Sequence, residues 1–189
     1  MIRILIAAID KNRGMGQSKS LSGLPWHIPN EMAYFRNITK GNGIEGKYAL
    51  VMGSVTYKKI LSLKNGGAEV DLETSEPLKM KGRDVLLLSS KNYENHKTFK
   101  TLEEISGYDA LFICGGLKVY DYAIKNGLVD YILLSKIKQS FECDAFMGEI
   151  EQGMELIDTI SFDEFDVLAY KANKKVESNL FNQLLSTLK

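Results

Sequence analysis

Four nearly continuous apolar runs constrain the fold of this chain more than any other feature. They span residues 2–9, 48–52, 85–88 and 110–114. Apolar runs that do not alternate with polar residues are typical of strands covered on both faces. Helical patterns lie between these runs, at residues 30–38, 55–63, 102–105 and 118–126. Strands that alternate with helices predict an α/β fold, with a central, mostly parallel sheet flanked by helices.

The second half of the chain predicts how this sheet ends. Residues 129–137 continue the strand pattern, and residues 156–160 and 165–172 predict a closing antiparallel pair. The result is a mixed sheet of about eight strands, in a single domain that spans residues 1–172. A long polar segment, residues 64–81, interrupts the pattern and is expected to be a surface excursion. We call it the insert.

Residues 173–189 predict a C-terminal amphipathic helical extension. Their apolar side chains recur at helical spacing and form one stripe, made of Val176, Leu180, Phe181, Leu184, Leu185 and Leu188. An apolar stripe must be covered, either by its own domain or by a second copy of the chain. We expect a monomer with the helix packed on its own domain, and a homodimer through this helix is the alternative.

Composition excludes several classes of protein. The chain has 24 Lys and Arg against 24 Asp and Glu, so no basic face for nucleic acid is expected. The apolar run at residues 4–9 is too short to span a membrane. Cys114 and Cys143 are too few for a disulfide framework, and with His27 and His96 they predict no metal site. We therefore expect a cytoplasmic protein that has no metal and binds neither nucleic acid nor membranes.

Residues 24–35 contain the only tryptophan and two of the three prolines. Pro29 can begin a helix, which places Glu31 in the first turn and Phe35 on the same face. A carboxylate among apolar side chains is unfavourable unless it is paired or protonated. By spacing alone, the segment fits a surface glutamate with Phe35 in the core. It also fits a pocket acid with a raised pKa.

Three strand ends carry residues suited to binding phosphate. They are Met52-Gly53-Ser54-Val55-Thr56, Leu88-Ser89-Ser90-Lys91 and Cys114-Gly115-Gly116. Ligands of open α/β sheets bind outside the carboxyl ends of the strands, where helix N-termini offer free N–H groups. None of the three is the glycine-rich dinucleotide fingerprint or a P-loop. Together they predict a dinucleotide site at one edge of the sheet.

Taken in order, these motifs resemble the dihydrofolate reductase family from Ile2 to about Ala172. The Pro-Trp, Glu and Phe pattern of residues 24–35 is the most specific of them. The others are Ala7-Ala8, Asn12-Arg13-Gly14-Met15-Gly16, Val51-Met52-Gly53, Gly82-Arg83, Leu88-Ser89-Ser90, and Cys114-Gly115-Gly116 with Val119-Tyr120. The resemblance implies NADPH-dependent reduction of 7,8-dihydrofolate to 5,6,7,8-tetrahydrofolate, a step that supports one-carbon metabolism and thymidylate synthesis. It also implies binding of antifolates such as methotrexate or trimethoprim.

The resemblance assigns residues to the substrate. Glu31 matches the pocket acid that holds the pterin and assists protonation at N5 while hydride reaches C6, and Ser135 matches the hydroxyl that supports this carboxylate. Trp26 and Tyr120 complete the implied catalytic set. Arg83 matches the arginine that grips the α-carboxylate of the substrate's glutamate, a task suited to a bidentate guanidinium. The remaining implied substrate contacts are Ile6, Ala8, Met32, Phe35, Ile60, Met80 and the backbone of Cys114.

The resemblance also assigns residues to the cofactor. Pyrophosphate binding is implied for Thr56, Gly115 and Gly116, and 2′-phosphate binding for Ser89, Ser90, Lys91 and Lys118. Further implied contacts are Ala8, Gly16, Leu24, Gly53, Ser54, Leu88, Val119 and Tyr120. Ser54 stands where the family usually has a basic residue. The expected preference for NADPH over NADH therefore rests on Lys91 and Lys118.

The loop of residues 17–23, which we call the lid, is rich in serine and glycine. It is about three residues longer than the family's usual active-site lid, and we expect it to be mobile. The reductase of riboflavin synthesis is the nearest enzymatic alternative, but residues 24–35 and Gly82-Arg83 suit a pterin and a glutamate tail better. A family member that binds NADPH without turnover is the alternative from another functional class.

Overall fold

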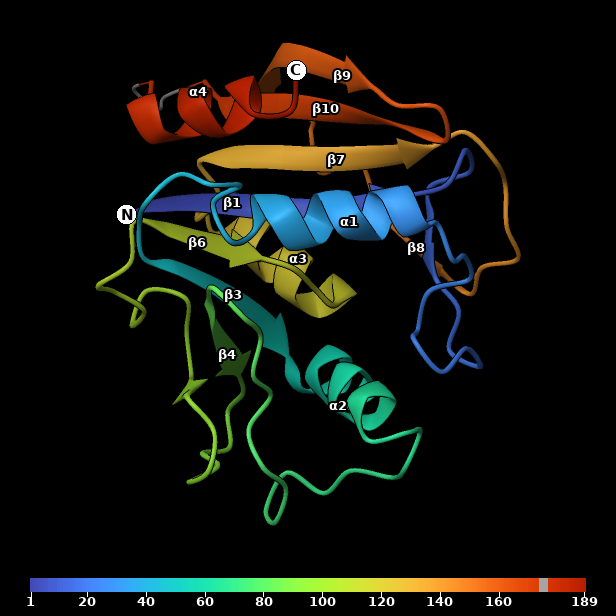
Figure 1. The fold of residues 1–189 in the computed structure, drawn as a ribbon, viewed down its shortest axis with the longest axis vertical. Coiled ribbons are helices and arrows are strands. Elements are labelled where there is room, and N and C mark those ends of the chain that lie inside the picture. Colours follow the sequence, from blue (N-terminus) through green and yellow to red (C-terminus); the bar gives the residue numbers. More distant parts are fainter. Residues whose placement is uncertain (174–176) are drawn as a thin grey trace.

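An eight-stranded mixed sheet forms the centre of the computed structural model, which describes residues 1–173 and 177–189 (Figure 1). In sheet order the strands are β5 (Thr98–Phe99), β4 (Asp84–Leu88), β3 (Tyr48–Gly53), β6 (Ala110–Ile113), β1 (Ile2–Ile9), β7 (Tyr131–Ile137), β10 (Phe165–Ala172) and β9 (Met154–Ser161). All strand pairs from β5 to β7 are parallel, whereas β10 is antiparallel to both β7 and β9. The predicted mostly parallel sheet with an antiparallel end is confirmed.

Four helices and a small second sheet complete the described residues. The helices are α1 (Pro29–Ile38), α2 (Ser54–Lys64), α3 (Leu117–Lys125) and α4 (Asn179–Ser186), and β2 (Gly14–Gly16) pairs with β8 (Ala145–Phe146). The helix predicted at residues 102–105 is wrong: Leu102 and Ile105 are buried within irregular turns. So short a segment, followed by Gly107 at φ 82°, cannot nucleate a helix. Among the described helices, none has both the length and the apolar character that a membrane span requires.

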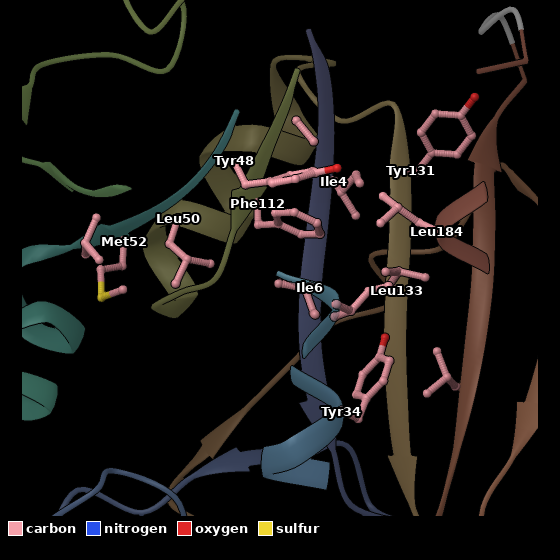
Figure 2. Close-up of a cluster of buried hydrophobic side chains, with 14 of the residues drawn as sticks. Ile4, Ile6, Tyr34, Tyr48, Leu50, Met52, Phe112, Tyr131, Leu133 and Leu184 are labelled. Atoms are coloured by element: carbon pink, nitrogen blue, oxygen red, sulfur yellow. The ribbon is translucent and has the colours of Figure 1, made fainter. Parts of the chain in front are cut away.

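Both faces of the sheet are covered, which explains the unbroken apolar runs. Along β1, Ile4 and Ile6 belong to the cluster that includes residues of α1, α2 and α4. Leu5 and Ala7, which alternate with them, belong to the cluster that includes residues of α3. Figure 1 shows α1 in front of the sheet and α3 behind it. Figure 2 shows the first cluster, where side chains of the central strands meet those of α1 and α4.

Helix α4 covers the sheet of its own chain. The Phe181 ring stacks on Tyr131 of β7 with the ring centroids 3.8 Å apart, and Leu184 and Leu185 are buried. The Ser178 hydroxyl caps the helix by accepting a hydrogen bond from the Phe181 N–H at 3.4 Å. The apolar stripe thus finds its cover within one chain. Val176, the first residue predicted for the stripe, lies outside the described residues.

A buried hydrogen-bond network anchors the insert to α2. Leu72 and Leu78 are 1% and 3% exposed, so the expectation of a surface excursion is wrong for this part of the insert. The Leu78 N–H donates to the Tyr57 hydroxyl at 2.7 Å, and this hydroxyl lies 2.9 Å from Nδ1 of His96. Nε2 of His96 lies 3.1 Å from the Leu72 carbonyl oxygen. Every group is satisfied when Tyr57 donates to Nδ1 and the Nε2–H donates to Leu72.

Candidate active site

Glu31 is a buried acid in the first turn of α1. It is 7% exposed, so the surface-glutamate interpretation of residues 24–35 is wrong. Burial raises the pKa of Glu31 from 4.5 to about 7, and an interaction with the Ser135 hydroxyl opposes part of this rise. Ser135 comes from β7, where it pairs with Ala8 of β1. A carboxyl group with a pKa near neutrality can hold and release a proton at physiological pH.

Trp26, another residue of the predicted site, has a buried polar atom that lacks a protein partner among the described residues. Within residues 1–173 and 177–189, neither Trp26 Nε1 nor Ser135 Oγ makes a hydrogen bond of normal geometry. The Trp26 ring packs against Phe141 with the centroids 5.5 Å apart. Buried polar groups are nearly always paired in native proteins. An indole N–H without a partner therefore indicates a position where a ligand or a water molecule binds.

Most of the predicted apolar wall belongs to one hydrophobic cluster. Its predicted members are the buried Ile6 and the partly buried Ala8, Phe35, Ile60, Met80 and Cys114. Met32 differs, because it is 43% exposed and lies outside this cluster. It follows Glu31 directly, and a step of one residue turns a helical side chain to a different face. Burial raises the pKa of the Cys114 thiol to about 12, so the thiol carries no charge in this wall.

Arg83 is a partly buried cation next to the insert. Its Nη1 lies 3.3 Å from the carbonyl oxygens of both Arg36 and Lys81, and its Nη2 lies 3.5 Å from the Met80 sulfur. In the part of the chain that the structure describes, Arg83 forms no salt bridge. Burial lowers its pKa. A partly buried guanidinium without an acidic partner is suited to binding a carboxylate of a ligand.

The three predicted strand ends meet at one edge of the sheet. Gly53 of β3 pairs with Leu88 of β4, and its N–H donates to the Gly115 carbonyl oxygen at 2.9 Å. Helices α2 and α3 begin directly after Gly53 and Gly116, and neither N-terminus has a side-chain cap. A Cβ on Gly116 would lie 3.0 Å from Thr56 Oγ1, so any larger residue here would crowd the Thr56 side chain. Two helix N-termini with free N–H groups thus come together, an arrangement that binds phosphate.

A pocket of about 280 Å³ opens beside these helix N-termini. The predicted residues that line it are Ala8, Gly16, Leu24, Thr56, Cys114, Gly115, Gly116 and Tyr120. The predicted cofactor residues that do not line it are Gly53, Ser54, Leu88, Ser89, Ser90, Lys91, Lys118 and Val119. Val119 packs against Gly53 instead, since a Cβ on Gly53 would lie 3.0 Å from Val119 Cγ2. Lys91 forms an ion pair with Glu73 of the insert.

Tyr120 connects this pocket to the central strand of the sheet. Its hydroxyl donates to the Ile6 carbonyl oxygen of β1 at 2.8 Å, and the residue is 4% exposed. Burial raises the pKa of Tyr120 well above its ordinary value, so the hydroxyl stays protonated and remains a donor. Tyr120 therefore fixes α3, and with it the pocket, relative to the wall formed by Ile6.

Two charged residues that the sequence did not predict also line the pocket. They are Lys59 of α2 and Asp144, which precedes β8. Both contact Ser18 of the lid, across sequence separations of 41 and 126 residues. No local pattern marks contacts of this range. In the sequence, Lys59 stands three residues after Thr56, which places both side chains on one helix face. This spacing was the one available indication that Lys59 lies near the predicted phosphate site.

Comparison with known proteins finds a matching family model, related sequences and a related structure. A family model described as dihydrofolate reductase matches residues 1–175. A dihydrofolate reductase from Mus musculus is 31% identical over 161 residues, which cover 81% of this chain and 83% of the mouse protein. A Mycoplasmoides gallisepticum protein named segregation and condensation protein A is 28% identical over 182 residues, covering 95% of this chain and 28% of that protein. A solved structure of a dihydrofolate reductase from Enterococcus faecalis, complexed with NADP(H) and RAB-propyl, has the same fold. Its TM-score is 0.68 at 22% identity, over 92% of this chain and 97% of that chain.

Proposed function

Because the chain belongs to the dihydrofolate reductase family, a family of oxidoreductases, we propose that it reduces 7,8-dihydrofolate to tetrahydrofolate with NADPH and a proton. The observation that carries the proposal is Glu31, a buried carboxyl group with a pKa of about 7. The reaction adds a hydride to C6 of the pterin and a proton to N5. A buried group that holds a proton near neutral pH is what the second addition requires.

Glu31 serves two purposes in the proposed reaction. Its carboxyl group hydrogen-bonds N3 and the 2-amino group of the pterin, which fixes the ring by a pair of bonds to one residue. It also holds the proton that reaches N5 through a water molecule. Trp26 Nε1, which has no protein partner within residues 1–173 and 177–189, is available to hydrogen-bond that water or the pterin. The Ser135 hydroxyl supports the Glu31 carboxyl group. Arg83 takes the α-carboxylate of the substrate's glutamate.

The edge of the sheet fits a dinucleotide cofactor. When bound, NADPH supplies the hydride. The uncapped N-termini of α2 and α3 and the Thr56 hydroxyl provide donors for a diphosphate, and the absence of a Cβ at Gly116 keeps that approach open. We assign the 2′-phosphate to the exposed Lys118 and to Lys91, since Ser54 carries no charge. Tyr120 holds the pocket against β1, which helps to bring the two reactants to the same place.

The first test is NADPH oxidation, followed by its near-ultraviolet absorbance with and without dihydrofolate. We expect wild-type kcat/KM to fall about tenfold per pH unit above pH ~7, because the protonated form of Glu31 is lost. Glu31→Gln should lose about 100-fold or more near pH 7 and regain activity at low pH, where solvent protonates the substrate. The matched control is Glu45→Gln, since Glu45 is exposed whereas Glu31 is buried.

The same variant tests the raised pKa without reference to turnover. The folded state disfavours ionised Glu31, so the wild type loses stability as pH rises from 4.5 to about 7 and keeps that loss at higher pH. Glu31→Gln carries no such charge. In urea denaturation, its free energy of unfolding should exceed the wild-type value by about 3 kcal/mol at pH 8, with no difference near pH 4.

Three outcomes would contradict the proposal in different ways. If Glu31→Gln were as active as Glu45→Gln, Glu31 would have no role in the reaction. Equal stability of Glu31→Gln and wild type at pH 8 would contradict the raised pKa. A folded wild type that binds methotrexate without turnover would favour the non-catalytic family member.

A further inference from the structure

The lid is held on one side by Asp144. The Ser18 N–H donates to both carboxylate oxygens of Asp144, each at 2.9 Å, and the Ser18 hydroxyl donates to one of them as well. These bonds, and then the charge of Lys59, lower the pKa of Asp144. A carboxylate thus binds the lid from the segment before β8.

Lys59 of α2 holds the lid on the other side. Its Nζ donates to the carbonyl oxygens of Ser18 and Ser20 at 2.9 and 3.2 Å. Gly23 makes room for the lysine stem, since a Cβ there would lie 3.0 Å from Lys59 Cδ. In Figure 1 the lid belongs to the blue segment that leads into α1, and α2 lies below this segment. The lid is therefore hydrogen-bonded on one side to an acid, Asp144, and on the other to a base, Lys59, which come from distant parts of the chain.

Lys59 also brings charge to the cofactor pocket. The first turn of α2 holds Ser54, Val55 and Thr56 and has no cation, and the neighbouring Lys58 is exposed and does not line the pocket. Lys59 does line it, together with Thr56, Gly115 and Gly116. An ammonium group has three N–H donors, and the two carbonyl oxygens use two of them without neutralising the charge. One donor and the positive charge remain for an anion.

We propose that Lys59 is a positioning residue with two roles. It holds the lid against α2, and it supplies a positive charge that attracts the anionic cofactor in this pocket. The assignment rests on the proposed function, because the anion in question is the cofactor's diphosphate. One ammonium group then serves both the lid and the cofactor. By linkage, closing the lid strengthens cofactor binding and cofactor binding stabilises the closed lid to the same degree.

The free protein tests the first half of the proposal. Trypsin cleaves after lysine, and Lys19 is an exposed lid residue between the two carbonyls that Lys59 holds. In Lys59→Met we expect cleavage after Lys19, followed by mass spectrometry, to be at least about fivefold faster than in wild type. Lys58→Met removes a lysine from the adjacent position and should be cleaved at the wild-type rate. Lys59→Arg, which keeps the charge and the donors, should restore slow cleavage.

Cofactor titration tests the second half. Trp26 is the only tryptophan, so its fluorescence can follow NADPH binding without turnover. Lys59→Met should bind NADPH about tenfold more weakly than wild type, the effect of losing one charge-assisted hydrogen bond. Lys58→Met should bind like wild type, and Lys59→Arg should recover most of the affinity.

The two measurements separate the possible failures. Lys59→Met cleaved as slowly as Lys58→Met would overturn the role in the lid, whatever the cofactor does. Faster cleavage with unchanged NADPH affinity would overturn the role toward the cofactor. A wild type that shows no NADPH binding would overturn the proposed function and that cofactor role together, while the cleavage rates would still decide the role in the lid.

Discussion

The lid and the insert are both attached to α2, but by opposite kinds of contact. The lid is held by Lys59 and Asp144 through exposed or partly exposed polar bonds, and its one large apolar residue, Leu21, is 70% exposed. The insert is held by Leu72 and Leu78 in the core and by the buried Tyr57–His96 network. Both segments are polar in sequence. The difference lies in what each one buries.

Because of this difference, the lid can open in the folded domain, whereas the insert cannot. Exposed charged contacts add little to stability, because water and salt compete for the same groups. Buried leucines and buried neutral hydrogen bonds are far costlier to lose, since opening exposes apolar surface and strands polar groups. The lid can therefore open while the domain stays folded. The insert can be released only when the packing around α2 is disrupted.

The largest expected effect is that of Leu72→Ala in the insert. Removing a buried leucine side chain should lower the free energy of unfolding by about 2–4 kcal/mol in urea denaturation. Its counterpart in the lid, Leu21→Ala, should change that value by less than about 0.5 kcal/mol. Similar losses in the two variants would abolish the distinction between the segments.

Tyr57→Phe should have the next largest effect. The substitution leaves the buried Leu78 N–H and His96 Nδ1 without a partner while keeping the ring. We expect a loss of about 1–3 kcal/mol in the free energy of unfolding. Tyr93→Phe is the matched control, because the Tyr93 ring also meets His96, with ring centroids 6.2 Å apart, and it lies outside the network. Equal stability of the two variants would show that the network does not anchor the insert.

Asp144→Asn should have the smallest effect on stability and a clear one on the lid. Asp144 is exposed, so the melting temperature should stay within about 1 °C of the wild-type value. Cleavage of the free protein after Lys19 should become faster, because the lid loses its carboxylate partner. Glu142→Gln is the control, since Gln17 contacts only the backbone of that residue. A large drop in melting temperature would place Asp144 among the structural anchors instead.

Strands, helices and the site differed in how far the sequence could predict them. Apolar runs and the signal at Pro29 are local, so β1, β3, β4, β6 and α1 were predictable. The helix predicted at residues 102–105 was wrong, because Leu102 and Ile105 are buried without forming a helix. For Glu31, spacing fitted both a surface and a pocket acid, and only the position of α1 on the sheet decides between them.

Long-range polar contacts were beyond the reach of the sequence. His96 stands in a polar stretch with no periodic signal, and its burial depends on how the insert folds back onto Tyr57. Lys59 and Asp144 meet the lid only because three separate segments come together. Such contacts depend on the final path of the chain rather than on any pattern within a segment.

The position of β1 in the sheet has a consequence for how the protein is made. This strand precedes the rest of the sheet in the chain, yet both of its neighbours come much later: Ile2 pairs with Ala110 of β6, and Ile4 pairs with Tyr131 of β7. A nascent chain that ends before residue 110 has an apolar strand with neither partner available. Parallel pairing between residues so far apart forms slowly and leaves intermediates prone to aggregation. The centre of the sheet therefore cannot form until β6 and β7 have been synthesised.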